Sequence, residues 1–447
     1  MKKLYLGVLF LFISTTVATQ PVLSMRDRAK LIDKILDDRL QNVLPQLMRR
    51  EGIDMWVLIS REYNEDPVLK TMLPATWLSA RRRTILVLFD PGQDAADQPL
   101  PIERLAVARY AVGDVFSQSW DKDQQPDQWQ ALVDLIIHKN PQKIALNKSS
   151  QIALTDGLSA TEFEEFSQAL GESLATRIVS SERLAVAWLE TRSAMEMAVY
   201  PDIVKLAHEI VAQAFSNDVI TPGVTTTSDV EWWLRERVAA LKLQTWFHPS
   251  VSIQRASAEK FDHLKAFSEG LDEQVILPGD LLHMDFGITY LRLNTDQQQH
   301  AYVLREGQSD APEYLKKALL NANRLQDIFT ANFKEGRTGN EVLLMSRQQA
   351  ITQGIKPAIY THPIGFHGHA AGTTLGMWDA QDGVPGEGDY PLHINTAYSI
   401  ELNAATFIPE WDKEIRIMLE EEAFFDQTGV RYMDGRQTTF HLIQHNK

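Results

Sequence analysis

Hydrophobic residues in the first part of the chain follow two different spacings. Apolar positions recur at helical spacing over 27–50, and Gly52 ends that stretch. Short apolar runs at 55–59, 85–89, 106–112 and 143–146 indicate strands. Helical spacing returns at 129–138 and 161–170. Because strands alternate with helices, we predict an α/β domain over about residues 25–185.

The second part of the chain starts with helical spacing and ends with strands. Long helices are expected over 190–214 and 229–243, with Pro222-Gly223 between them. A strand is expected over 281–288, and two further helices over 312–332 and 340–353. The last hundred or so residues are Gly-rich and strand-like. A second domain over 190–447 follows, since 447 residues exceed what one hydrophobic core usually covers.

Residues 1–24 have the pattern of a secretory signal peptide. Lys2 and Lys3 precede an apolar run over 4–13, and small or polar residues follow at 16–18. The run is too short for a bilayer span, which takes about 20 residues. A buried core helix is the alternative interpretation. The pattern predicts a periplasmic or secreted protein without membrane contact once the signal is removed.

Composition narrows the chemistry. The net charge is −15, and Arg81-Arg82-Arg83 is the one cationic triplet, which argues against nucleic acid as a partner. Neither a G-x-G-x-x-G fingerprint nor a P-loop occurs. The chain has no cysteine, so disulfides and thiolate metal sites are excluded. Any bound metal must be held by His, Asp and Glu.

Two aspartates lie close to one apolar run. Asp285 interrupts the run over 281–288, and Asp296 lies eleven residues later. A hairpin return between them could bring both carboxylates to one point. The alternative is a pair of unrelated surface aspartates, because 59 of the 447 residues are acidic.

Histidines and glutamates complete the candidate site. Three histidines fall among eight residues, and two glutamates sit inside apolar strand-like runs; these are His362, His367, His369, Glu401 and Glu420. A turn-rich loop with solvent-exposed histidines is the alternative for the cluster. Arg416 and Glu420 share a strand face, so Arg416 could hold a ligand carboxylate ionised and oriented. Oxygen and nitrogen donors of this kind suit a pair of divalent ions, with Mn, Zn, Co and Fe as the options.

In order and spacing, these residues resemble the pita-bread metallopeptidases: methionine aminopeptidase, aminopeptidase P and prolidase. The resemblance covers about residues 190–447, and the preceding domain resembles that of the aminopeptidase P, prolidase and creatinase branch. It implies an α/β N-terminal domain plus an α+β pita-bread catalytic domain with two divalent metal ions. By this resemblance, Asp285 would bind one ion through both carboxylate oxygens, and Asp296 and Glu420 would bridge the two ions. His362 and Glu401 would bind the other ion. Glu401 would also act as general base.

The resemblance extends to residues around the ligands. It implies that His369, seven residues after His362, contacts the substrate or the tetrahedral intermediate. A further cleft histidine upstream would be His263, with His248 as the alternative. Glu421 is the alternative to Glu420 as the last ligand.

The chain also departs from the family pattern. Ala358 stands where the proline-handling branch often has a histidine, and Met418 where an arginine is usual, so proline specificity is left open. The implied function is a metal-dependent exopeptidase acting on peptides or dipeptides, of Xaa-Pro aminopeptidase or prolidase type. The alternatives are a hydrolase or lyase of a small non-peptide substrate, and a non-catalytic binding module. Retention of all five ligands favours metal chemistry; the oligomeric state stays open, with a homodimer as one option.

Overall fold

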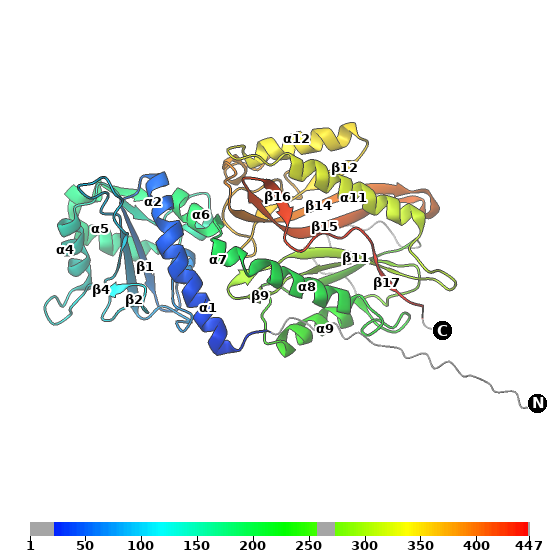
Figure 1. The fold of residues 1–447 in the computed structure, drawn as a ribbon, viewed down its shortest axis with the longest axis horizontal. Coiled ribbons are helices and arrows are strands. Elements are labelled where there is room, and N and C mark those ends of the chain that lie inside the picture. The colour runs from blue at the N-terminus through cyan, green and yellow to red at the C-terminus, as the bar shows by residue number, and fades with distance from the viewer. Residues whose placement is uncertain (1–21, 257–272, 446–447) are drawn as a thin grey trace, which may run out of the picture.

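The computed structural model describes residues 22–256 and 273–445, and Figure 1 shows two bodies, each built around its own sheet. The predicted signal peptide, up to residue 21, and His263 lie outside the described residues. Within the described ranges, no helix has the length and apolar character needed to cross a membrane.

The N-terminal domain is a six-stranded sheet flanked by helices, so the predicted α/β fold is confirmed. The sheet order is β4-β3-β2-β1-β5-β6, in which β1 runs antiparallel to β2 and parallel to β5. The strands are β1 (Met55–Arg61), β2 (Arg83–Phe89), β3 (Glu103–Ala106), β4 (Ser117–Gln118), β5 (Ile144–Leu146) and β6 (Ile178–Ser180). The helices are α1 (Met25–Asp38), the π-helical turn η1 (Arg39–Val43), α2 (Leu44–Glu51), α3 (Pro67–Thr71), α4 (Gln128–Lys139), the 3-10 turn η2 (Ala153–Thr155) and α5 (Ala160–Ala175).

Two expected elements differ from the structure. The strand predicted over 106–112 is wrong, because β3 ends at Ala106 and Val112 forms only an isolated bridge with Phe116. The single helix predicted over 190–214 is also wrong. A helix α6 (Glu182–Glu190) ends where the predicted helix would begin, and two separate helices follow, α7 (Ala194–Met197) and α8 (Tyr200–Ala214). The chain breaks because Ser193 adopts an extended conformation and caps α7 in a capping box with Glu196.

The second domain contains a sheet of nine strands among the described residues. Its main order is β12-β14-β15-β11-β8-β7, with β13, β16 and β17 paired to β14, β15 and β11. Its strands are β7 (Ser250–Gln254), β8 (Leu281–Phe286), β11 (Gln297–Val303), β12 (Lys356–Ile359), β13 (His362–Pro363), β14 (Thr396–Ile408), β15 (Lys413–Asp426), β16 (Gly429–Tyr432) and β17 (His441–Ile443), and a separate hairpin is formed by β9 (Thr289–Tyr290) and β10 (Leu293–Asn294). Helices and turns are α9 (Thr227–Ala240), α11 (Glu313–Ala331), α12 (Gly339–Thr352), η3 (Glu387–Asp389) and η4 (Pro409–Trp411).

Helices cover one face of this sheet. In Figure 1, α11 and α12 lie over the half of the sheet that contains β14 and β15. The helices α8 and α9 lie along the half that contains β11, at the bottom of the domain in this view. Because side chains alternate along a strand, Tyr398, Ile400 and Leu402 of β14 pack against α11 and α12. Ser399 and Glu401 therefore point to the opposite face, which we call the inner face.

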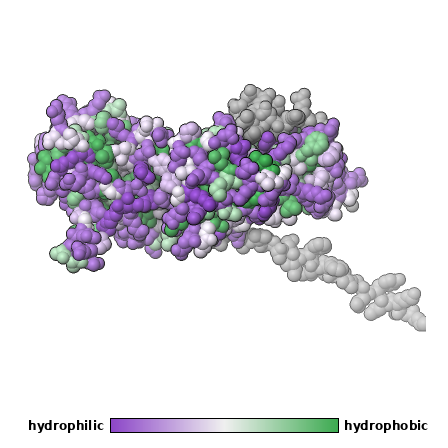
Figure 2. Space-filling view, turned by 90° about the horizontal axis from the view of Figure 1, so that it is seen from above, coloured by the Kyte–Doolittle hydropathy of each residue, from purple (hydrophilic) through white to green (hydrophobic). Residues whose placement is uncertain are grey.

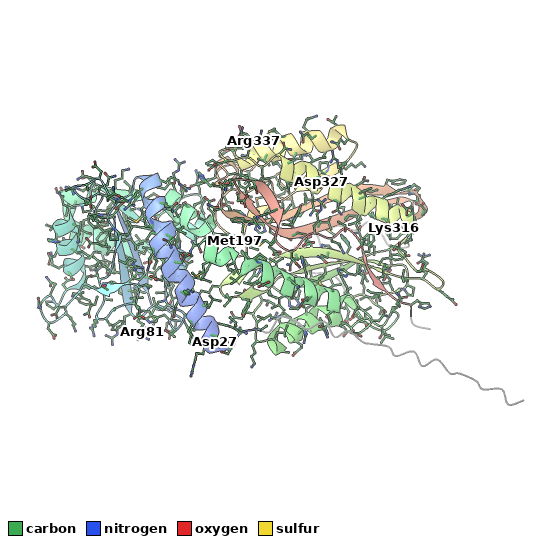
Figure 3. All side chains as sticks on the ribbon, in the orientation of Figure 1. Asp27, Arg81, Met197, Lys316, Asp327 and Arg337 are labelled. Atoms are coloured by element: carbon green, nitrogen blue, oxygen red, sulfur yellow. The ribbon has the colours of Figure 1, made fainter. Side chains whose placement is uncertain are left out.

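The two domains meet through apolar and polar contacts. Leu31 and Ile32 of α1 pack against the core of the second domain. Arg292 donates hydrogen bonds to the carbonyls of Leu73 and Pro74, at 2.6 and 3.1 Å. Met197, labelled in Figure 3, marks α7 at this junction. The face of the molecule shown in Figure 2 is mostly hydrophilic, with small scattered hydrophobic patches, in keeping with the net charge of −15.

Candidate metal centre

Four polar side chains form a row across neighbouring strands. The strand register places Glu401 opposite Glu420, Glu420 opposite Gln298, and Gln298 opposite Asp285. These residues come from β14, β15, β11 and β8, and directly opposed residues in a sheet point to the same face. The register thus gathers three of the expected ligands on the inner face.

Asp296 and His362 close this row from one side. Asp296 lies between β10 and β11, and His362 lies in β13, opposite Ser399. The Nε2 atom of His362 is 3.8 Å from Asp296 Oδ2 and 3.7 Å from Glu420 Oε1. All five expected ligands therefore converge, including the two aspartates whose alternative was to be unrelated surface residues.

The converged side chains form overlapping groups of possible ligand atoms. Within each group the atoms lie within 4.8 Å of one another, and the groups are Asp285 with Asp296 and Glu420, His362 with Glu401 and Glu420, and Asp296 with His362 and His369. Two groups share Glu420 and two share His362. This overlap is the arrangement expected of two ions bridged by shared carboxylates.

The electrostatics of the group call for a cation. Removal from water raises the pKa of Asp285, Asp296 and Glu401, and repulsion from Glu420 raises it further. Asp285 Oδ1 and His362 Nε2 are buried atoms without a hydrogen-bond partner among the described residues. Unpartnered buried polar atoms are costly. A divalent ion with oxygen and nitrogen ligands would satisfy both atoms, so the residues present fit the metal that the sequence predicted.

Glu421 does not join the group. It lies on the other face of β15, where its carboxylate bonds to His208 Nε2 at 2.6 Å and accepts from Gln299 Nε2 at 2.9 Å. Glu422 supports the site instead, because it accepts hydrogen bonds from the backbone N–H of Asp296 and from Gln297 Nε2. Burial raises the pKa of Glu422 to about 8. Of the two alternatives for the last ligand, the geometry favours Glu420.

The other expected histidines fall in different places. His369 lies at the exposed edge of the group, with its ring centroid 4.6 Å from that of His362 and 5.2 Å from that of Trp246. Burial of its ring, with the neighbouring His362, lowers the pKa of His369 to about 4. His248 is 46% exposed and contacts Arg235, at 3.2 Å, outside the groups of ligand atoms.

The role expected of Arg416 needs correction. Its Nη1 atom donates to Asn403 Oδ1 at 2.7 Å, two rungs along the ladder from the Glu401–Glu420 pair. The side chain that holds the ligand carboxylates is Gln298, which was not among the residues expected from the sequence. A signal was present: Gln297, Gln298 and Gln299 form a run of three amides in a strand that is buried throughout. Such a run is unusual because a buried amide needs hydrogen-bond partners.

Several solved peptidase structures resemble this chain. The X-Pro aminopeptidase from Thermotoga maritima has a TM-score of 0.62 and 15% identity, over 89% of this chain and 99% of that one. The Xaa-Pro dipeptidase from Bacillus anthracis has a TM-score of 0.55 and 15% identity, over 94% and 100%. The prolidase from Pyrococcus furiosus has a TM-score of 0.52 and 14% identity, over 88% and 99%. These likenesses confirm the fold, an N-terminal domain plus a pita-bread catalytic domain.

Comparison of the amino-acid sequence with known sequences and family models identifies the family. No curated protein sequence matches the chain significantly. The family model for metallopeptidase family M24 matches residues 202–434, a span that contains every residue of the acidic group and more than half of the chain. The chain belongs to metallopeptidase family M24.

Proposed function

We propose that this metallopeptidase is a two-metal exopeptidase that cleaves a peptide bond next to a free N-terminal residue. In this proposal Asp285, Asp296, His362, Glu401 and Glu420 hold two divalent ions. The observation that supports it best is the overlap at Glu420 of the two three-atom groups made by the five proposed ligands, together with the unpartnered Asp285 Oδ1 and His362 Nε2. Two three-atom groups that share one carboxylate can bind two ions at once.

The proposed division of labour follows from where each side chain lies. Two ions held by shared carboxylates activate water and polarise the scissile carbonyl when bound. Glu401, whose carboxylate is fixed by Gln298, carries the proton from the attacking water to the leaving amine. His369, at the exposed edge, contacts the substrate and is neutral at pH 7, because the pKa of His369 is lowered to about 4.

We extend the proposal to peptides with proline after the first residue. The structural neighbours described above are an X-Pro aminopeptidase, an Xaa-Pro dipeptidase and a prolidase. The rings of Trp246, Tyr360 and Trp378 lie around His369 or next to it, with Tyr360 5.9 Å from Trp378. Flat apolar rings suit a compact apolar residue such as proline. Ala358 and Met418 depart from the proline-handling pattern, so this extension needs its own test.

The direct test is hydrolysis by metal-loaded protein of a matched peptide panel. The panel contains dipeptides, Xaa-Pro tripeptides, the same tripeptides with alanine for proline, and N-acetylated copies. We expect loss of single N-terminal residues, identified by mass spectrometry, that stops with EDTA and with N-acetylation. Preference for the Xaa-Pro members supports the extension. Absence of hydrolysis of any peptide by protein that holds two ions would contradict the exopeptidase proposal.

We also propose that the protein is exported. Support comes from the order of charged, apolar and small residues over 1–24. N-terminal sequencing of protein recovered from its source cells should then begin after roughly residue 18 to 24. Recovery with Met1 intact would contradict export through this signal.

A further inference from the structure

Gln298 is the uncharged side chain at the centre of the acidic group. We propose that Gln298 is a positioning residue of the metal centre, whose amide fixes the carboxylates of Glu401 and Glu420 in the orientation that binds the ions. The inference rests on the proposed two-metal function and adds a residue to it. It also explains how so many acids can be held together without a cationic side chain among them.

The contacts of Gln298 occupy its whole amide. The side chain is 1% exposed, and its Nε2 donates to Glu401 Oε1 at 2.7 Å and to Glu420 Oε2 at 2.6 Å. Its Oε1 lies 2.9 Å from Nε2 of His283, which is itself 5% exposed. Both amide hydrogens and the amide oxygen therefore have partners.

The direction of these bonds is fixed by chemistry. When Glu401 and Glu420 bind metal they are ionised and only accept hydrogen bonds, so the NH₂ end of the Gln298 amide must face both carboxylates. The oxygen end then faces His283, which must donate through Nε2. Strand pairing supports the same geometry, because Gln298 lies opposite Glu420 on β15 and opposite Asp285 on β8. His283 is two residues from Asp285 on β8, and so it faces the same side of the sheet as Gln298. The amide has one orientation that satisfies all three neighbours.

This arrangement divides the oxygens of the two carboxylates. Gln298 binds Oε1 of Glu401 and Oε2 of Glu420, and Ser399 Oγ donates to Oε1 of Glu420 at 2.7 Å. That Oε1 is also the oxygen 3.7 Å from His362 Nε2. The carboxylates are thus held before a cation arrives. Pre-oriented ligands bind metal more tightly, since partners behind the ligands typically change metal affinity 10- to 100-fold.

An uncharged donor suits this position better than a charged one. Lysine or arginine between Glu401 and Glu420 would offset the negative charge that attracts the ions. Glutamine supplies two N–H donors and leaves the net charge of the ligand group unchanged. Gln298 therefore orients the ligands without reducing the negative charge that attracts the ions.

The neighbouring glutamine offers a matched control. Gln299 is also buried and also donates to a buried glutamate, Glu421, at 2.9 Å. It points to the other face of the strand, and Glu421 belongs to none of the groups of ligand atoms. Loss of its amide removes the same kind of hydrogen bond without touching the proposed ligands.

The experiment compares Gln298→Met and Gln299→Met in the full chain. Mn²⁺ affinity is measured by calorimetry, and the ligand geometry by the visible absorption spectrum of the Co²⁺-loaded protein. We expect Gln298→Met to weaken Mn²⁺ binding by about 10- to 100-fold and to change the Co²⁺ spectrum. Gln299→Met should bind Mn²⁺ as the wild type does, with the wild-type spectrum, even if its thermal stability falls.

Two results would overturn the inference, and they differ from failure of the proposed function. If Gln298→Met fails to fold, Gln298→Asn replaces it, because its amide is one methylene too short to reach both carboxylates and the same losses are expected. Wild-type affinity and spectrum in the folded Gln298 variant contradict the positioning role, as does equal weakening in Gln299→Met. If the wild type and Gln299→Met bind no Mn²⁺ at all, the two-metal function itself is wrong.

Discussion

Asp285 shows at the scale of one residue why the inner face needs a cation. Asp285 lies between the apolar residues Met284 and Phe286 in β8. One oxygen of its carboxylate, Oδ1, is buried without a partner among the described residues. Loss of surrounding water and the nearby Glu420 raise the pKa of Asp285. A side chain in this position stabilises the fold only when protonated or bound to metal.

Replacement of Asp285 by asparagine keeps the shape and removes the charge. We expect Asp285→Asn to weaken divalent metal binding by more than about 100-fold, beyond the effect typical of residues behind the ligands. Peptidase activity should fall in parallel. Calorimetry with Mn²⁺ and the peptide assay measure the two losses on the same sample. Activity that disappears while both ions stay bound would show that Asp285 is not a ligand.

His369 should separate substrate chemistry from metal binding. His369→Ala is expected to keep both ions and to lower kcat by roughly 10²–10⁴, the range of lost acid–base or transition-state help. His367→Ala is the matched control, since His367 comes from the same histidine cluster and belongs to none of the groups of ligand atoms. Its activity per folded molecule should stay near that of the wild type. Full turnover by metal-loaded His369→Ala would remove its proposed role.

The part of the candidate site that could be predicted from sequence consists of carboxylates that lie within apolar runs. Asp285, Glu401 and Glu420 stand out because each interrupts an apolar run. Gln298 was missed because an amide carries no charge and its partners come from β14 and β15, more than a hundred residues away. Arg416 was misjudged because a shared strand face does not say how far a side chain lies from its target along the strand.

At the scale of elements, α8 is tied to β15 by one histidine. His208 bonds to Glu421 at 2.6 Å and to Asp434 at 2.9 Å. Burial lowers the pKa of His208, but the two carboxylates outweigh this effect and raise the pKa to about 10. The imidazolium compensates for the buried charge of Glu421, directly behind the candidate metal ligand Glu420.

Loss of this contact should appear as a change in the pH dependence of stability. The pKa of His208 is about 10 in the folded protein, against about 6.5 for unfolded histidine. Its stabilisation is therefore complete below about pH 6.5 and is lost as pH rises toward 10. His208→Gln should cost about 3 kcal/mol at pH 6 and progressively less toward pH 10.

Denaturant unfolding of metal-loaded protein across this pH range measures the effect. His248→Gln is the control, because His248 is 46% exposed and lies 4.0 Å from Glu231. We expect it to change the free energy of unfolding by less than about 0.5 kcal/mol at every pH. A constant cost for His208→Gln between pH 6 and 10 would mean that the imidazolium is not what stabilises this contact.

Elements were predicted well where spacing was regular and poorly where the chain breaks. The helices over 128–139, 313–331 and 339–352 lie within a residue or so of their predicted positions. The chain over 190–214 was expected to be one continuous helix. A capping box at Ser193 interrupts it, and local capping is harder to recognise than periodicity.

At the scale of the whole molecule, metal binding and stability should depend on each other. The pKa values of Asp285, Asp296 and Glu401 are raised in the metal-free fold. Raised carboxyl pKa values mean that the folded protein binds more protons than the unfolded chain. The free energy of unfolding of the metal-free protein should therefore decrease as pH rises above about 4, where the carboxyls of the unfolded chain ionise.

Metal should reverse this loss. We expect Mn²⁺ to raise Tm more at pH 8 than at pH 5, because protons compete with the ion for the ligands. At a metal concentration about 100 times Kd, each occupied site adds about 2.7 kcal/mol. Thermal unfolding of EDTA-treated protein with and without Mn²⁺ at both pH values gives the comparison. An equal Tm increase at pH 5 and pH 8 would show that the buried carboxyls are not the binding groups.

The two-domain plan was predictable from sequence, but the contact between the domains was not. Chain length, together with the alternation of strands and helices over about residues 25–185, indicated two domains. The hydrogen bonds from Arg292 to the carbonyls of Leu73 and Pro74 join residues more than two hundred positions apart. Every residue has a backbone carbonyl, so a single sequence does not indicate which carbonyls accept such hydrogen bonds. Contacts of this kind are seen only in the structure.

The most direct test of the central claim is an anomalous diffraction measurement on crystals of the Mn²⁺-loaded protein. Data collected at the manganese absorption edge should show two peaks, about 3.5–4 Å apart. Both should lie among Asp285, Asp296, His362, Glu401 and Glu420, with Gln298 hydrogen-bonded behind the two glutamates. A single peak, or peaks away from these side chains, would contradict the two-metal centre.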